Sequence, residues 1–279
     1  MWTEFKQTLL RRLRGQVIGW GIGLAVYSLL LVALYPSVSQ MEDLDQFLTN
    51  YPEEMLAFFG NLTLLHTPMG YLDTYFFNYM TIMMGILAVG AGAALLVADE
   101  ERGTLDLILA HPIGRTALFG GRLLAFTVAI ALIVLLNWLC WFVPSRQIGM
   151  DLTWVEFLRP FVGLFVQLLL FGALALLLSL ALPARRAAAM LAGALLVANY
   201  LLQGMANIDE RLQAVVAFTP LHYYQGGRAV EGLNWGWLGG LLLVTLGLLL
   251  AAWALFQRRE IRVGGEHGWR VPGFDRLVK

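Results

Sequence analysis

The stretch LFGGRLLAFTVAIALIVLLNWLCWFV (residues 118–143) decides the fold of this chain. It carries a single charged side chain, Arg122, close to its start. A helix needs about 20 predominantly apolar residues to cross the hydrocarbon core of a bilayer. The stretch therefore predicts a transmembrane helix.

Five further apolar stretches flank this one. None has Asp, Glu, Lys or His in its middle, and the prolines fall in loops or at the ends of the stretches, where a missing backbone donor is least costly. Only 14% of all residues are charged and the mean hydropathy is +0.69, whereas soluble domains carry roughly 25% charged residues. The sequence predicts an all-α, polytopic membrane protein, a single domain over residues 1–279. Its six transmembrane spans are expected at 17–35, 76–98, 118–143, 161–182, 187–205 and 236–256.

The distribution of basic residues predicts the orientation. Fifteen of the 19 Lys and Arg lie before the first span, between the second and third, between the fourth and fifth, or after the sixth. The loop 36–75, on the other side, holds six acidic residues and no Lys or Arg. Because basic loops stay in the cytoplasm, both termini are expected there. The first span is too long for a cleaved signal and should remain as an anchor.

Residues 1–16 form a distinct segment before the first span. Trp2, Phe5, Leu9 and Leu13 recur at helical spacing, and basic residues occupy much of the remaining surface. This pattern predicts an amphipathic helix at the membrane interface. Attraction to anionic lipid and docking to a protein partner explain it equally well.

The stretch DEERGTLDLILAHPIGRTALFGGR (residues 99–122) is the most informative for function. Gly103 permits a sharp turn, and Thr104 is suited to cap a new helix. The apolar run 105–110 is too short to span a membrane, and Pro112 ends it. We expect a short apolar helix at the cytoplasmic face, with Leu105, Ile108 and Leu109 available to insert into a partner.

This stretch resembles the signature E-x-x-G-T-L-x-x-[IL]-L-x-x-P-[IL]-x-R of ABC-2 type (type V fold) permeases, the membrane subunits of ATP-binding cassette exporters. The resemblance implies that residues 99–117 form a coupling-helix loop that docks in a groove of an ATPase subunit. It also extends to the six spans, the amphipathic start and an outer re-entrant segment at 206–235. Where the family often has Lys, this chain has Arg122, which keeps the charge. The residues that the resemblance assigns to ATPase coupling are Glu100, Glu101, Gly103, Thr104, Leu105, Ile108, Leu109, Pro112 and Arg115, and Ile113 also matches the signature.

The chain lacks the sequence of a nucleotide-hydrolysing site. A phosphate-binding loop requires G-x-x-x-x-G-K-[ST], and the only lysines, Lys6 and Lys279, do not follow a glycine. ATP and Mg are therefore expected on a partner ATPase, present in two copies. Because six spans are half the number that the family uses for one pathway, the resemblance also implies a second permease, as a homodimer or a related heterodimer.

Among the uncharged polar residues inside the expected spans, four amide side chains are candidates for a role in transport. They either line a translocation path or form hydrogen bonds between helices. Asn199 and Gln203 are the stronger path candidates, because residues four apart share one face of a helix. We expect no metal or cofactor on this chain: His66 and His222 have no second ligand at metal-binding spacing. The four polar residues are Asn137, Gln167, Asn199 and Gln203.

The leading hypothesis is a multi-pass permease of an ATP-driven exporter in a bacterial or archaeal plasma membrane. An intramembrane enzyme would need a base or metal ligand at membrane depth, and the spans offer no Asp, Glu or His. An ion-coupled secondary transporter is the runner-up, and a non-transporting anchor for an ATPase is a third possibility. A net charge of zero gives no indication of a nucleic-acid partner.

Overall fold

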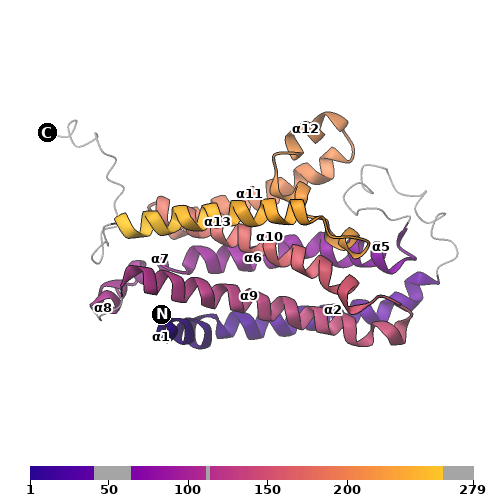
Figure 1. Cartoon of the computed structure of the whole chain (residues 1–279), viewed down its shortest axis with the longest axis horizontal. Helices are drawn as coiled ribbons and strands as arrows, with labels where there is room; N and C mark the ends of the chain where they lie inside the picture. The colour runs from indigo at the N-terminus through magenta and orange to yellow at the C-terminus, as the bar shows by residue number, and fades with distance from the viewer. Residues whose placement is uncertain (41–63, 111–113, 260–279) are drawn as a thin grey trace.

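The computed structural model describes residues 1–40, 64–110 and 114–259 of the chain. Within these ranges the regular structure is helical throughout, and no strand occurs. Six helical segments are long and apolar enough to cross a membrane, and Figure 1 shows them running side by side along the long axis of the molecule. The predicted all-α fold with six spans is therefore confirmed.

Each spanning segment is one helix or a continuous series of helical elements. The second predicted span ran past the end of its helix, because α6 ends at Ala94 and a turn at residues 95–96 separates it from α7. The elements of the spans are α1 (Trp2–Gln7), η1 (Thr8–Leu13) and α2 (Arg14–Ser39); α5 (Pro68–Leu72), η3 (Asp73–Phe77) and α6 (Asn78–Ala94); α9 (Arg115–Ser145) and η4 (Arg146–Ile148); α10 (Trp154–Ala181); α11 (Arg185–Ala206); and α13 (Trp235–Arg258).

Short helices connect the spans at the two ends of the bundle. One end, which we call the α8 end, carries α1, α7, α8 and the last turn of α13, and the opposite α12 end carries α5 and α12 (Figure 1). All predicted cytoplasmic segments that the structure describes therefore share one end. The connecting elements are α7 (Val97–Glu101), α8 (Leu105–Leu109), η5 (Glu210–Leu212), α12 (Gln213–Val216), η6 (Pro220–Tyr223) and η7 (Gly226–Val230).

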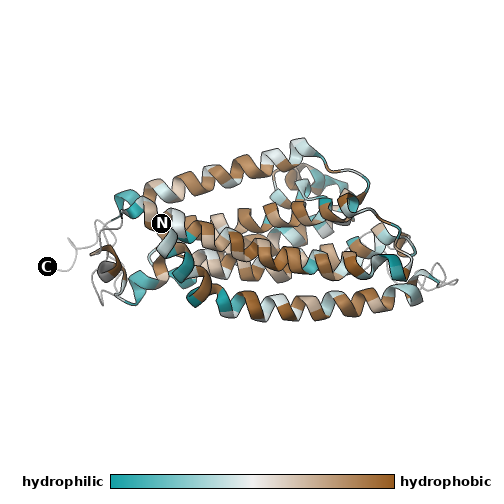
Figure 2. Ribbon diagram, turned by 60° about the horizontal axis from the view of Figure 1, so that its bottom comes forward, coloured by the Kyte–Doolittle hydropathy of each residue, from teal (hydrophilic) through white to brown (hydrophobic). Residues whose placement is uncertain are grey.

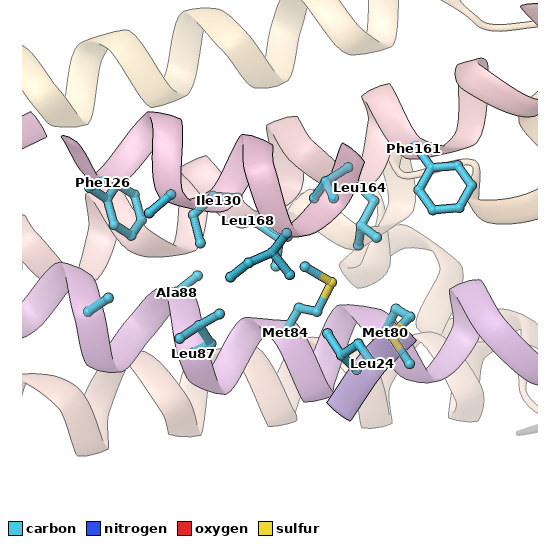
Figure 3. Packing of buried hydrophobic residues seen from close by; sticks show 14 of the residues in the cluster. Leu24, Met80, Met84, Leu87, Ala88, Phe126, Ile130, Phe161, Leu164 and Leu168 are labelled. Atoms are coloured by element: carbon cyan, nitrogen blue, oxygen red, sulfur yellow. The ribbon is translucent and has the colours of Figure 1, made fainter. Parts of the chain in front are cut away.

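Helices α6 and α10 form the centre of the bundle. Both are mostly buried, and α10 packs against α6, α9, α11 and α13. Figure 3 shows Met84 and Leu87 of α6 lying opposite Leu168 of α10, with Ile130 of α9 beside them. Long flexible and branched apolar side chains fill this layer without polar atoms, which suits a core that excludes water.

The remaining spans leave wide apolar surfaces exposed. Most of α2, α11 and α13 is not covered by the rest of the chain. Figure 2 shows the long helices of the bundle as predominantly hydrophobic along their length. Exposed side chains such as Leu30, Leu195 and Leu243 lie on these surfaces. A soluble monomer rarely exposes apolar patches of this extent, whereas a bilayer or a second membrane chain can cover them.

Two glycines allow α6 and α10 to approach closely. A Cβ atom on Gly92 would lie 2.3 Å from the backbone oxygen of Gly172, and a Cβ on Gly172 would lie 2.3 Å from the ring of Phe126. Small residues bring helix backbones together in membranes in this way. The packing of α10 against α6 and α9 therefore depends on the absence of these two side chains.

We expect Gly92→Ala to destabilise the protein by about 1–3 kcal/mol, because the added methyl group meets a backbone atom that cannot rotate away. Gly90→Ala is the matched control, since a Cβ there would meet no atom within 4 Å. That control should be neutral or slightly stabilising, because alanine favours a helix over glycine. Thermal unfolding of both variants in one detergent measures the difference, and equal unfolding temperatures would contradict the packing described here.

The N-terminal segment packs against the bundle along part of its expected apolar face and along polar residues beside it. Trp2 is 64% exposed, whereas Glu4 and Thr8 are buried where α1 and η1 pack against α9. Leu13 is the expected apolar residue that is fully buried. The π-helical turns of η1 continue into α2, so the segment is joined to the first span without a break. Burial of the Glu4 carboxylate at this position requires a charged partner.

Candidate functional site

The sequence that resembles the coupling-helix signature folds into an elbow at the α8 end. α7 follows the end of α6, Gly103 turns the chain with a φ of 67°, and α8 extends from the bundle (Figure 1). A positive φ is readily adopted by glycine because it has no Cβ atom. We refer to residues 97–109 as the elbow. Pro112, which was predicted to end the short helix, lies outside the described residues.

Thr104 holds the elbow together in a way that the sequence did not predict. Its carbonyl accepts the first backbone hydrogen bond of α8, from Ile108, which is the role of a residue preceding a helix. Its hydroxyl is directed back toward α7, where it donates to the carbonyl oxygen of Asp99 at 3.3 Å. This bond closes the turn between α7 and α8.

The apolar residues of α8 divide between the core and the surface. Leu105 is only 2% exposed and belongs to the main hydrophobic core, so the expectation that it is available to a partner is wrong for this residue. Ile108 and Leu109 are partly buried and keep part of their surface free. Leu105 therefore anchors α8, and the other two side chains remain as its apolar contact surface.

Asp99 is the buried centre of an ion-pair network. Its carboxylate is paired with Arg12 of η1 and with Arg122 of α9, whose Nη2 lies 2.6 Å from Asp99 Oδ2. Arg122 is 1% exposed, donates to the carbonyl oxygen of Leu95 at 3.0 Å, and lies 3.8 Å from a carboxylate oxygen of Glu4. These contacts explain how Glu4 is buried and join the N-terminal segment, the elbow and α9.

The two acids that follow Asp99 pair with other parts of the chain. Glu100 Oε1 lies 3.2 Å from the guanidinium of Arg259, directly after α13. Glu101 forms an ion pair of 2.9 Å with Arg185 at the start of α11 and also accepts from its backbone N–H. A carboxylate at a helix N-terminus is favoured by the helix dipole as well. Three consecutive carboxylates of the elbow thus connect to α9, α13 and α11.

Arg115, the first residue of α9, links the start of this helix to the end of α13. Its guanidinium donates to the carbonyl oxygens of Phe256, Gln257 and Arg259 at 2.8–3.2 Å. Carbonyls at the end of a helix have no partner within it, so a cationic donor stabilises them twice, by hydrogen bonds and by the helix dipole. The last turn of α13 is therefore held by Arg115 on one side and by the pair of Arg259 with Glu100 on the other.

The electrostatics of Asp99 favour the charged form. Burial raises the pKa of this carboxyl, but the hydrogen bond from Arg12 and the charges of Arg122 and Arg12 outweigh burial and hold its pKa below the ordinary value. The carboxylate is therefore ionised at neutral pH and pairs with the arginines as a full charge.

The four polar candidates for a translocation path have different surroundings. Asn137 accepts a hydrogen bond of 2.9 Å from Ser28 of α2, so it links two helices. Asn199 donates to Leu195 in its own helix, and Gln167 is buried among apolar neighbours of α10. Gln203 lines a polar cavity.

This polar cavity, at the α12 end, contains residues that the sequence analysis missed. It has a volume of about 110 Å³ and is lined by side chains from η3, α6, α11 and the segment 221–228. Asp73 accepts a hydrogen bond of 2.7 Å from the backbone N–H of Gly227 at its edge. Asp73 lay outside the predicted second span, which began at residue 76, although a lone acid next to an apolar helix was a usable signal. Other lining residues are Asn78, Thr81, Tyr200, Tyr224 and Arg228.

Comparison with known proteins identifies the family of the chain. The family model of the ABC-2 family transporter protein matches residues 18–261, which include five spans in full, most of the first, the elbow and the segment between α11 and α13. None of the curated proteins matches the chain. Members of this family are membrane subunits that have no ATPase site of their own and work with an ABC ATPase. The chain belongs to the ABC-2 family and is a membrane permease subunit of an ABC transporter.

Proposed function

We propose that the chain is the permease of an exporter driven by ATP that a partner ATPase binds and hydrolyses. Two ATPase copies serve two permease chains, which are identical or related and together form one pathway. The complex lies in the plasma membrane of a bacterium or archaeon, and the α8 end faces the cytoplasm. The excess of arginine at this end and the acidic loop 36–75 on the opposite side support this orientation.

The connectivity of the elbow is the observation that carries the proposal. Ile108 and Leu109 offer a small apolar surface on a helix that extends from the bundle, and Leu105 fixes that helix to the core. Behind it, Asp99, Glu100 and Glu101 reach Arg122, Arg259 and Arg185 on three different spans or their ends. A displacement of α8 is therefore passed to α9, α13 and α11 together.

Closure of the ATPase dimer supplies the displacement. ATP binding brings the two ATPase subunits together and moves the groove that holds α8. Because α8 and α7 are joined by the Thr104 bond and the buried Asp99 network, they move as one piece. The spans attached to this piece then change their packing, and the pathway between the two permeases switches from inward to outward access.

Purification of the full chain from its native host tests the proposal. A P-loop ATPase should copurify, together with a second copy of this chain or a related permease. Reconstituted in lipid vesicles, the complex should hydrolyse ATP and move substrate outward only when ATP is present. Substrate movement that persists without ATP and stops when an ion gradient is dissipated would favour a secondary transporter instead. Hydrolysis without any substrate movement would favour a non-transporting anchor.

A further inference from the structure

A second cavity at the α8 end lies between η1, α6 and the start of α11. It has a volume of about 380 Å³, which is within the range of about 300–1,000 Å³ that small-molecule sites occupy. Four guanidinium groups line it, from Arg11, Arg12, Arg102 and Arg185, and none of the acidic side chains that the structure describes does. We call this cavity the arginine cleft.

The four arginines of the cleft fall into two pairs. Arg12 and Arg185 are held by carboxylates of the elbow, Asp99 and Glu101 respectively. Arg11 and Arg102 are exposed, and no carboxylate whose side chain the structure describes forms an ion pair with either of them. The cleft therefore has two positioned guanidiniums and two free positive charges, and it favours an anion.

Part of the lining of the arginine cleft is small and apolar. Ala91, Ala94 and Ala98 line the cleft at the end of α6 and the start of α7, where the apolar part of the second span ends. A soluble phosphate gains nothing from such a wall. A phospholipid gains from both surfaces, because its phosphate can contact the arginines while its glycerol region lies against the alanines.

We propose that the arginine cleft binds the phosphate headgroup of an anionic phospholipid from the adjacent leaflet. Guanidinium groups recognise phosphate through paired, charge-assisted hydrogen bonds. Two of the four arginines that would hold the lipid also pair with the elbow, so a bound headgroup lies directly beside Asp99 and Glu101. The inference requires only that the chain lies in a membrane, and it stands apart from the direction and energy source of transport.

The proposal is tested with the full chain in detergent micelles, by native mass spectrometry at graded concentrations of phosphatidylglycerol and of phosphatidylcholine with the same acyl chains. We expect tighter binding of phosphatidylglycerol. In the variant Arg11→Gln/Arg102→Gln its affinity should fall about 25-fold, since each arginine contributes about fivefold. The matched control, Arg14→Gln/Arg186→Gln, removes two exposed arginines outside the cleft and should change the affinity less than twofold.

Further measurements identify the ligand and check that the variants are folded. The variant Arg11→Lys/Arg102→Lys keeps both charges and should bind more tightly than the glutamine variant, and all variants should unfold at the wild-type temperature. Equal binding of the two lipids, or equal effects of the cleft and control variants, would overturn the proposal. Displacement of the lipid by inorganic phosphate or glycerophosphate at similar concentration would assign the cleft to a soluble anion. Unchanged lipid binding with lost ATPase association would assign it to protein docking.

Discussion

Replacing Asp99 with asparagine should destabilise the protein by about 3–5 kcal/mol, the largest effect that we expect from a single substitution outside the core. The reason is the burial of its partner Arg122, which is 1% exposed. Arg122 would keep its charge, and the carboxylate left beside it would be that of Glu4, at 3.8 Å. Removing one member of a buried ion pair leaves an uncompensated charge, which is strongly unfavourable. Thermal unfolding in a fixed detergent at neutral pH measures the loss.

Two further variants make this result specific. Asp151→Asn removes an exposed carboxylate at the opposite end and should change the stability by less than about 0.5 kcal/mol. Adding Arg122→Met and Glu4→Gln to Asp99→Asn removes the buried positive charge together with the carboxylate that depends on it, so this triple variant should be more stable than Asp99→Asn alone. If Asp99→Asn unfolded at the same temperature as Asp151→Asn, the network would not be a source of stability.

The same network predicts a dependence on pH. Because the pKa of Asp99 is lower in the folded protein than in the unfolded chain, its contribution is fully present above the unfolded pKa of about 3.9. The contribution is lost as the pH falls through the lower folded value. Wild-type stability should therefore decline more steeply than that of Asp99→Asn below about pH 4. Parallel declines would contradict the assignment.

Replacing Ile108 with aspartate should abolish association with the partner ATPase and transport-coupled ATP hydrolysis, without unfolding the permease. Ile108 is partly exposed on α8, so the substitution places a charge on the surface that would enter an apolar groove. An unpaired buried charge is costly enough to prevent docking. Copurification of the ATPase with the tagged permease, followed by hydrolysis assays in vesicles, measures both losses.

Ile208→Asp is the matched control, because Ile208 is an exposed isoleucine at the α12 end. It should leave ATPase association unchanged. Leu105→Asp should behave differently from both, since Leu105 is buried in the core and the substitution should lower the unfolding temperature of the permease itself. Intact association and coupling in Ile108→Asp would mean that α8 is not the contact with the ATPase.

The spans and the elbow were predictable because each depends on neighbours in sequence. Uninterrupted apolar runs such as residues 118–143 identify membrane helices by length alone. Gly103 marked the turn before α8 because few other residues adopt its backbone conformation. The end of α6 was not predictable, because the turn at residues 95–96 consists of two leucines and leaves the apolar run in the sequence uninterrupted.

The ion pairs that connect the elbow to other helices were not predictable from one sequence. Asp99 pairs with Arg12, 87 residues away, and Glu100 pairs with Arg259, 159 residues away, so no local spacing relates them. The burial of Leu105 was not predicted for a similar reason. An apolar face of a helix does not reveal whether the rest of the chain or a partner covers it. The cavity around Asp73 and Gly227 likewise requires two segments that meet only in the folded bundle.

The ion pairs that connect the elbow to α9, α11 and α13 differ in their exposure to water. Ionic strength should therefore weaken some of them more than others. Glu101 and Arg185 are 39% and 36% exposed, so dissolved salt screens their attraction, whereas Asp99 and Arg122 are shielded from it. Concentrated salt should therefore release α11 from the elbow first and leave α9 attached. A permease kept in such a buffer would retain its fold while the ion pair between the elbow and α11 is broken.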